Sequence, residues 1–229
     1  KSEVPEIHEG IVEIMGISRD PGGRTKISVS SADSDIDAVG ACVGMRGSRV
    51  QNIIQELKGE KIDIVPWSPD PARYSCNALS PARVNKVILD ESSKIMEVIV
   101  DEDQYSLCIG RRGQNVRLAS ELTEWEITVK TDVQLKEEQQ SVVKLLLTLP
   151  NISEVNANLL FAGGYHTLED IAFGEIESIS KSSGITNDED IEKIQLAARN
   201  ALKDRLRNIE IEDKNINEDI NEEGENLKD

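Results

Sequence analysis

The sequence predicts an α+β protein in which two copies of one small unit precede an all-helical segment and a disordered acidic tail. Three observations carry this prediction. An internal repeat is indicated by ACVGMRGSRVQNII (41–54) and LCIGRRGQNVRLAS (107–120), which align without a gap at a spacing of 66 residues. Alternating apolar and polar runs, typical of half-buried strands, flank both stretches. Beyond residue 132 these runs give way to short helical patterns broken by glycines.

The first copy is predicted over residues 1–67, in the order helix, strand, strand, helix, helix, strand. A short helix is expected in SEVPEIHEG, and a hairpin over 11–31 with its turn at Pro-Gly-Gly. After the glycines, apolar residues recur with the i, i+3, i+4, i+7 spacing of an amphipathic helix: Val50, Ile53, Ile54 and Leu57. The alternating run KIDIVPW (61–67) predicts the closing strand.

The second copy is predicted over residues 68–132 with the same order of elements. A helix is expected in PARYSCNALSP, and a hairpin over 84–101 that turns at Glu-Ser-Ser. A helical stripe then follows the second glycine stretch: Val116, Ala119 and Leu122. The run WEITVKT (125–131) predicts the last strand. The sequence thus predicts one αββααβ unit twice, with almost no linker.

Residues 133–207 are predicted to form a small all-α domain of the helix-hairpin-helix kind. Gly163 and Gly164 break one helix, and Thr167 is placed to cap the next, with Asp170 completing a capping box. A second break falls at Gly184, followed by a cap at Asn187 or Asp188. Acidic residues surround these turns, so contact with a protein or a purely structural role is expected rather than contact with nucleic acid.

The tail, residues 208–229, contains 9 acidic and 2 basic residues and few apolar ones. It is predicted to be disordered because it has little apolar surface to bury. It accounts for much of the formal net charge of −17. We also weigh a hypothesis in which residues 133–229 compete with RNA for the arginines of the glycine loops.

Composition excludes several classes of protein. No run of 18 apolar residues exists, so no membrane span is expected. Cys42, Cys76 and Cys108 are odd in number and widely spaced, which argues against a disulfide framework and for an intracellular, cytoplasmic protein. With only two histidines, zinc-ligand spacing is absent, and no metal or cofactor is expected. The N-terminus lacks methionine and a signal sequence, and we expect it to be cut from a longer chain.

The two glycine loops, 44–47 and 110–113, carry the candidate chemistry. Glycine lets a ligand approach the backbone closely, and the helix that follows presents free N–H groups to an anion. Arginines inside or just after the loops add paired donors for phosphate. A plain glycine turn between two helices is the alternative, and the second copy in a matching context disfavours it. Val116, Ile127 and Val129 are expected to form the floor of a narrow groove for unpaired bases.

The order αββααβ with G-x-x-G between the helices resembles the prokaryotic type of KH domain, whose loop clamps about four nucleotides of single-stranded RNA. VPEIHEGIVEI, GACVGMRGSRVQ, GEKIDIV, NALSPA and IGRRGQNVRLAS together resemble the tandem KH region of the NusA family of bacterial transcription factors. One departure is Arg112, where the family often has a small polar residue. The acidic helical segment is similar to the C-terminal repeats of some members.

The resemblance implies a function and a set of partners. It implies binding of single-stranded nascent RNA, together with RNA polymerase and other antitermination factors, in pausing, termination and antitermination. It also implies two further domains ahead of residue 1 and no enzyme activity. The expected RNA-binding residues are Gly44, Met45, Arg46, Gly47, Ser48, Arg49, Gly110, Arg111, Arg112, Gly113, Gln114, Asn115 and Arg117.

Two alternatives to this function stay open from the sequence. In the first, the KH units present substrate to the catalytic domain of an RNA-processing enzyme that lies outside this chain. In the second, the acidic helical segment and tail act as a protein-interaction scaffold.

Overall fold

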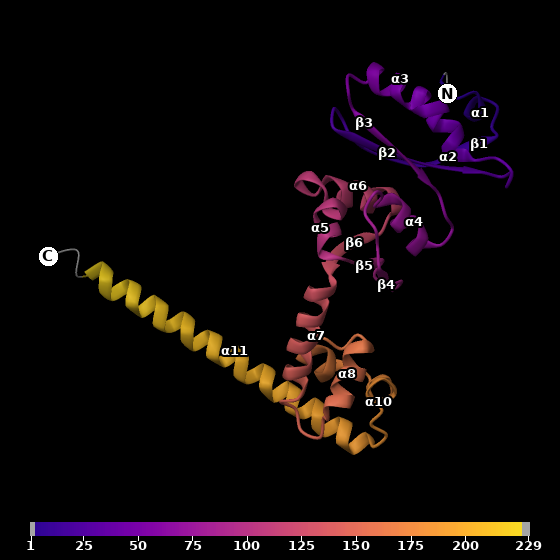
Figure 1. The fold of residues 1–229 in the computed structure, drawn as a ribbon. Helices are drawn as coiled ribbons and strands as arrows, with labels where there is room; N and C mark the ends of the chain where they lie inside the picture. The colour runs from indigo at the N-terminus through magenta and orange to yellow at the C-terminus, as the bar shows by residue number, and fades with distance from the viewer. Residues whose placement is uncertain (1–2, 226–229) are drawn as a thin grey trace. The chain divides into compact units, whose positions relative to one another are not determined.

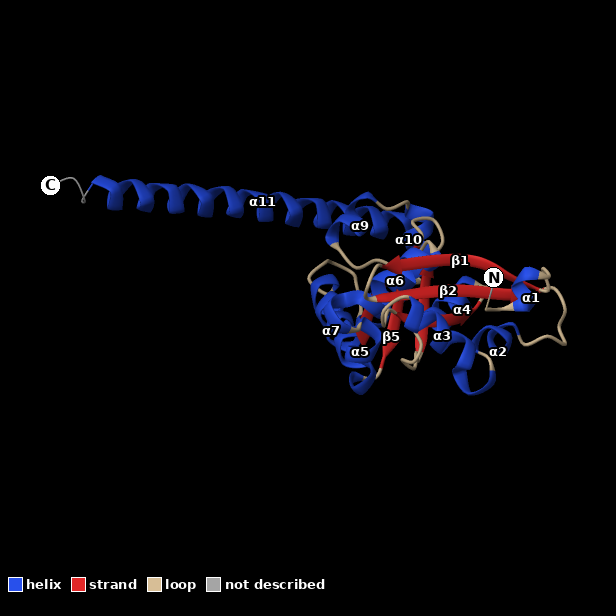
Figure 2. Cartoon of the chain, turned by 90° about the horizontal axis from the view of Figure 1, so that it is seen from above, coloured by secondary structure: helices blue, strands red, loops and turns tan. Residues whose placement is uncertain are grey.

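A computed structural model of the chain describes the backbone of residues 3–225 and the side chains of residues 3–207. The chain divides into two compact units, residues 1–135 and 136–229 (Figure 1). The first unit contains two three-stranded sheets, and the described part of the second contains helices only (Figure 2). The predicted α+β class is confirmed.

The first module of unit 1 folds in the order αββααβ. Its elements are α1 (Pro5–His8), β1 (Val12–Asp20), β2 (Arg24–Ser31), α2 (Ala38–Val43), the 3-10 turn η1 (Met45–Gly47), α3 (Ser48–Glu56) and β3 (Lys61–Pro66). Strand β2 is central, antiparallel to β1 and parallel to β3. The β1–β2 turn falls where Pro-Gly-Gly predicted it, with the Gly23 N–H donating to the Asp20 carbonyl at 2.9 Å.

The second module repeats this topology. Its elements are α4 (Pro71–Ala78), β4 (Lys86–Asp90), β5 (Ile95–Val100), α5 (Glu102–Ile109), the 3-10 turn η2 (Arg111–Gly113), α6 (Gln114–Thr123) and β6 (Glu126–Thr131). Strand β5 is central, antiparallel to β4 and parallel to β6. The repeat predicted from the sequence is therefore confirmed in both topology and order.

The cores of the two modules are apolar, and Val65 of β3 in the first module joins the core of the second. Cys42 is buried in the first core and Cys108 in the second. Ile127 and Val129 are also buried in the second core, so the prediction that they form the floor of a groove for bases is wrong. The alternation of apolar and polar residues correctly predicted which face of β6 is buried. That face packs against helices of its own module and is therefore not open to bases.

The two modules are held together by α6 of the second, which contacts β1 and β2 of the first. Leu122 approaches the sheet closely because Gly16 carries no side chain, and a Cβ there would lie 3.4 Å from the leucine methyl. Polar contacts flank this packing, since the Ser18 hydroxyl donates to the Glu121 carboxylate at 2.7 Å. The modules therefore share one packed interface.

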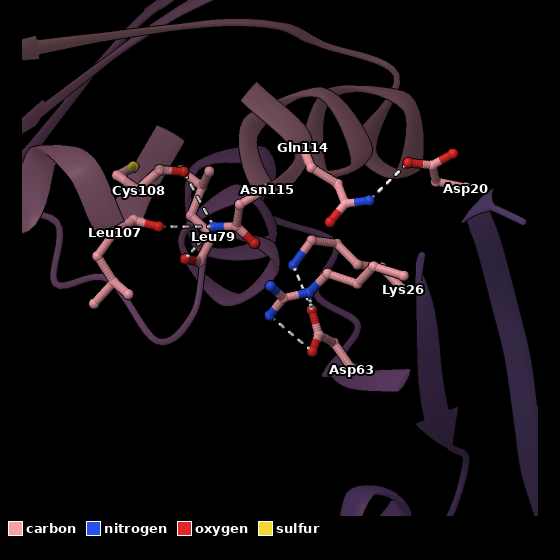
Figure 3. A network of polar contacts seen from close by, with 9 residues as sticks. Asp20, Lys26, Asp63, Leu79, Leu107, Cys108, Gln114 and Asn115 are labelled. Carbon is pink, nitrogen blue, oxygen red and sulfur yellow. Dashed lines mark hydrogen bonds and ion pairs between the residues drawn. The ribbon is translucent and has the colours of Figure 1, made fainter. Parts of the chain in front are cut away.

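A buried charge cluster lies on β2 and β3 of the first module (Figure 3). The Lys26 side chain is fully buried, and its Nζ donates to the Asp63 carboxylate at 2.9 Å. Arg24 donates to both Asp63 oxygens, at 2.6 and 3.0 Å. Burial lowers the pKa of Lys26, although Asp63 opposes that shift. Burial alone raises the pKa of Asp63, but hydrogen bonds from Arg24 and Lys26 lower it overall.

A second carboxylate, Glu60, fastens the β1–β2 turn to the start of β3. It is 1% exposed and accepts hydrogen bonds from the Arg19 guanidinium at 2.8 and 2.9 Å, the Gly22 N–H at 2.9 Å, and the Thr25 hydroxyl. The hydrogen bonds from Arg19, Thr25 and Gly22 lower the pKa of Glu60 to about 2. The ionised carboxylate is thus the form that the fold stabilises.

Acid should therefore weaken this contact. Because the pKa of Glu60 in the folded chain lies below its usual value, its contribution is full above about pH 4.5 and is lost as pH falls toward 2. We expect Glu60→Gln to lower the free energy of unfolding at pH 7, with the difference from wild type shrinking between pH 5 and pH 3. Urea denaturation at several pH values measures this. A difference that does not change with pH would contradict it.

Unit 2 contains most of α7 (Asp132–Leu146) and all of α8 (Glu154–Ala162), α9 (Leu168–Phe173), α10 (Ile176–Ser183) and α11 (Asp188–Glu225). Thr167 and Asp170 form the predicted capping box at the start of α9. The Asn187 side chain accepts from the Glu189 N–H at 3.1 Å, so Asn187 is the cap of α11. Leu146, Leu160, Ile171, Ile179 and Ile191 lie at the centre of one apolar core.

Helix α11 continues to Glu225 and so runs through most of residues 208–229, for which disorder is predicted; residues 226–229 lie outside the described part. Starting a helix is the costly step, and here residues 188–207 have already started it. Each further residue needs only propagation, and this stretch contains no proline.

None of the helices between residues 3 and 225 is long and apolar enough to cross a membrane. Among the side chains that the structure describes, no group of three or more His, Cys, Asp and Glu is placed to hold a metal ion.

Candidate nucleic-acid interface

The two glycine loops have the same backbone. The first glycine of each ends a helix, with φ 74° and ψ 173° at Gly44 and φ 75° and ψ 172° at Gly110. Only glycine adopts this region without strain. The last glycine closes each loop as a 3-10 turn, since Gly47 N–H donates to the Gly44 carbonyl and Gly113 N–H to the Gly110 carbonyl, both at 3.1 Å.

An arginine occupies the left-handed position of each loop. Arg46 has φ 53° and ψ 27°, and Arg112 has φ 55° and ψ 32°. A residue with a Cβ costs about 1–2 kcal/mol in this region, so both loops hold an arginine in a strained conformation. Strain of this kind gathers at ligand-binding sites, which makes these two positions candidates for contact with a ligand.

The helices that leave the loops begin without a side-chain cap. Gly47 precedes α3 and Gly113 precedes α6, and neither helix start receives a side-chain hydrogen bond. The first N–H of each helix, at Ser48 and at Gln114, donates to a carbonyl of the 3-10 turn, that of Met45 or Arg111. The positive end of each helix dipole nevertheless faces its loop with no side chain bound to it, which favours an anion there.

The exposed side chains of the loops differ between the modules. Met45 is 89% exposed in the first loop, where the second loop has Arg111. Arg46, Arg111 and Arg112 are all exposed, as is Ser48 at the start of α3. The second loop thus presents two guanidinium groups and the first presents one guanidinium beside a thioether.

Two predicted site residues are bound to partners within their own module. Asn115 is 2% exposed and its amide donates to main-chain carbonyls of its own module, so the prediction that it contacts RNA is wrong (Figure 3). Arg49 is 31% exposed and donates to the Glu6 carboxylate. The sequence pattern marked both as polar residues near a loop, but it carries no information on which way they point.

Gln114 and Arg117 reach the other module. The Gln114 amide donates to Asp20 at 2.6 Å, at the β1–β2 turn (Figure 3). Arg117 lies 3.2 Å from the same carboxylate and 2.9 Å from Glu121, and half of its side chain is exposed. Both residues therefore help to hold α6 against the first module, and Arg117 keeps an exposed side beside the second loop. No local pattern in the sequence marks Asp20 as a partner of these two residues.

Comparison with known proteins agrees with this arrangement. Residues 1–67 match the NusA-like first KH domain and residues 71–137 match the NusA-like second KH domain. The chain belongs to the NusA family. The transcription termination/antitermination protein NusA of Rickettsia prowazekii (strain Madrid E) is 44% identical over 191 residues, which are 80% of this chain and 38% of that protein.

A second NusA relative, from Halalkalibacterium halodurans, is 55% identical over 135 residues, which are 59% of this chain and 35% of that protein. The chain therefore spans less than two fifths of the length of these NusA proteins. The crystal structure of APE1850 covers 56% of this chain and 96% of its own, at 21% identity and a TM-score of 0.42.

The two glycines of a NusA-type loop should tolerate substitution differently. A Cβ on Gly110 would lie 2.7 Å from the Asn115 Cβ, whereas a Cβ on Gly113 would meet no atom within 4 Å. Gly113→Ala should cost about 1–2 kcal/mol of strain. Gly110→Ala should cost at least about 1 kcal/mol more. The added methyl group would overlap the Asn115 side chain, and residues with a Cβ adopt the backbone conformation of Gly110 less readily than that of Gly113. Thermal unfolding of the two variants checks this order, and equal losses would contradict it.

Proposed function

We propose that this chain binds single-stranded RNA through loops 44–47 and 110–113, as part of a bacterial transcription factor that acts with RNA polymerase. One observation carries the proposal: the two loops repeat the same strained backbone, with an exposed arginine at the left-handed position and an uncapped helix start behind it. Phosphate fits this arrangement because it accepts several N–H donors at once.

Each loop residue then has a role. The glycines let the RNA backbone approach the main chain, and Arg46, Arg111 and Arg112 contact phosphates. Ser48 begins α3 and Gln114 begins α6, at the helix ends where a phosphate would bind. Met45 contacts a base or a sugar, since its thioether is apolar and exposed. The second loop has two arginines and the first has one, so the second loop contributes more of the electrostatic attraction to RNA.

The role in transcription rests on the family. Relatives are named transcription termination/antitermination proteins, and we extend to this chain a role in pausing, termination and antitermination with RNA polymerase and other antitermination factors in the cytoplasm. The alternative of an RNA-processing enzyme that uses these modules to present substrate gains no support from the residues that the structure describes.

A titration of single-stranded RNA tests the proposal. The chain is added to a fluorescently labelled RNA of about 12 nucleotides, and anisotropy is measured at 50 and 200 mM salt. Single-stranded binding weakens with a slope of about 0.7 per phosphate contacted, so three arginine contacts predict a loss of roughly 20-fold. No binding by the folded chain, or binding that salt does not change, would refute the proposal.

For unit 2 we propose contact with a protein, with RNA polymerase as the partner. A groove of about 630 Å³ between α9 and α11 is lined by Glu169, Phe173, Arg199, Leu202, Lys203, Arg205 and Leu206. Phe173 is 74% exposed and Leu206 63% exposed, and large apolar side chains exposed together in one groove are typical of a protein-binding surface. The Arg199 guanidinium lies 6.0 Å from the Phe173 ring centre and its Nε donates to the Ala172 carbonyl, so one wall is held in place.

We expect Phe173→Ser to weaken binding to purified RNA polymerase by roughly 30-fold, since a central aromatic residue of an interface contributes about 2 kcal/mol or more. Val155→Ser is the control, because Val155 is 67% exposed and lies outside the groove. Biolayer interferometry measures both variants, and RNA affinity should stay unchanged in each. Equal polymerase binding by both would refute the groove as the contact.

A further inference from the structure

Arg49 and Asn115 occupy the same position of the repeat, five residues after the first glycine of each loop. The sequence suggested that both contact RNA. The structure instead gives each a set of partners inside its own module, and in both modules these partners lie in the first helix and in the helix that leads into the loop.

In the first module Arg49 joins two helices. Its Nη1 lies 2.8 and 3.0 Å from the two Glu6 carboxylate oxygens on α1. The same nitrogen donates at 2.5 Å to the carbonyl of Ala41, in the helix that leads into the loop. The Arg49 stem packs against Gly44, where a Cβ would lie 2.7 Å from Cγ. Arg49 thus connects α1, the end of α2 and the first glycine.

In the second module Asn115 makes the same connection with an amide (Figure 3). Its Nδ2 donates at 3.0 Å to the carbonyl of Leu79, which ends α4, the counterpart of α1. It donates at 3.1 Å to Cys108, and lies 3.5 Å from the carbonyl of Leu107, the counterpart of Ala41. The Asn115 Cβ packs against Gly110 as the Arg49 stem packs against Gly44.

We infer that this position is a strut that holds each RNA-binding loop at a fixed angle to the first helix of its module, and that Arg49 positions the first loop and makes no phosphate contact. The inference rests on the proposed RNA-binding function. Its basis is that both side chains join the first helix of the module to the helix that leads into the loop and pack against the first glycine, while their chemistry differs. Asn115 is neutral and buried, so in the second module this position connects the helices without a charge and without reaching a ligand.

Glu6→Gln separates the two roles of Arg49 by the sign of its effect. If Arg49 contacted phosphate, removing the carboxylate that holds it would release a cation and raise RNA affinity. If Arg49 is a strut, loosening it should lower RNA affinity about 3- to 10-fold, because the loop must then be ordered on binding. Glu9→Gln is the matched control, since it removes the same charge from an exposed residue at the end of α1.

The measurement is the RNA titration with the whole chain at several salt concentrations. For the strut we expect weaker binding by Glu6→Gln than by Glu9→Gln, with the same salt slope, because no phosphate contact is lost. Amide hydrogen exchange should become faster at residues 44–48 and stay unchanged at 110–114. Adding Glu6→Arg to Arg49→Glu, which reverses the ion pair, should recover part of the affinity that Arg49→Glu loses.

The outcomes are distinct. If the wild-type chain binds no RNA, the proposed function fails. If the wild type binds and Glu6→Gln binds as tightly as Glu9→Gln or more tightly, the strut is refuted. A lower melting temperature for Glu6→Gln with unchanged loop exchange and unchanged RNA affinity would also refute it, because Arg49 would then only stabilise the fold. Asn115→Ala should weaken RNA binding through the second loop with an unchanged salt slope; if it fails to fold, Glu6→Gln still decides.

Discussion

Replacing both Arg111 and Arg112 by aspartate is expected to weaken RNA binding at least 100-fold while the chain stays folded. Both side chains are exposed in the second loop, and neither makes a hydrogen bond or ion pair that would be lost from the described contacts of the fold. A hydrogen bond to a charged group contributes about 1.5–3 kcal/mol, so two phosphate contacts account for a loss of this size. The two new carboxylates add repulsion. Fluorescence anisotropy at 50 mM salt measures the RNA affinity of the double variant, and circular dichroism confirms that it is folded.

The matched control is Arg83→Asp with Lys86→Asp. It makes the same change of charge in the second module on two exposed residues outside the loop; the Arg83 side chain lies 3.9 Å from the Asp103 carboxylate, near the start of α5. We expect this control to lose only the affinity that the general change in charge explains, no more than about tenfold. Comparable losses in both double variants would mean that RNA responds to net charge, and that the loop has no special role.

Asp63→Asn is expected to cost about 3–5 kcal/mol of unfolding free energy, the largest effect among the fold variants. Lys26 is fully buried and would lose its carboxylate partner, and an unpaired buried charge carries a cost of that order. Lys26→Met should cost about 1 kcal/mol or less, because Asp63 keeps its two hydrogen bonds from Arg24 and an apolar side chain of similar length fills the site. Urea denaturation at pH 7 compares the two.

The pH dependence offers a check on this assignment. Burial already lowers the pKa of Lys26, and losing Asp63 removes the group that opposes the shift. The folded variant then binds fewer protons than the unfolded chain, so its stability should rise with pH. The cost of Asp63→Asn is therefore expected to shrink between pH 7 and pH 9.5. If the loss of unfolding free energy in Asp63→Asn did not change with pH, altered packing and lost hydrogen bonds would explain it, and the buried charge of Lys26 would not.

The sequence alone determined the order of elements. Strand alternation, the Pro-Gly-Gly turn and the Thr167–Asp170 cap depend on contacts within a few residues of each other, so their signals are local and survive without knowledge of the fold. The same holds for the glycine loops, because a glycine at φ 75° and ψ 172° is required by the main chain itself. In the two αββααβ modules the internal repeat shows the same local patterns twice, which strengthens the prediction of each element there.

Only the tertiary structure decided which polar residues are available to a ligand. Lys26 lies on a strand where a lysine is normally solvated, yet it is buried because the second module packs over that sheet. Asn115 and Arg112 are neighbours in sequence, but the amide points into the module and the guanidinium into solvent. The direction of each side chain depends on contacts with residues that are tens of positions away in the sequence. A local sequence pattern carries no information on such contacts.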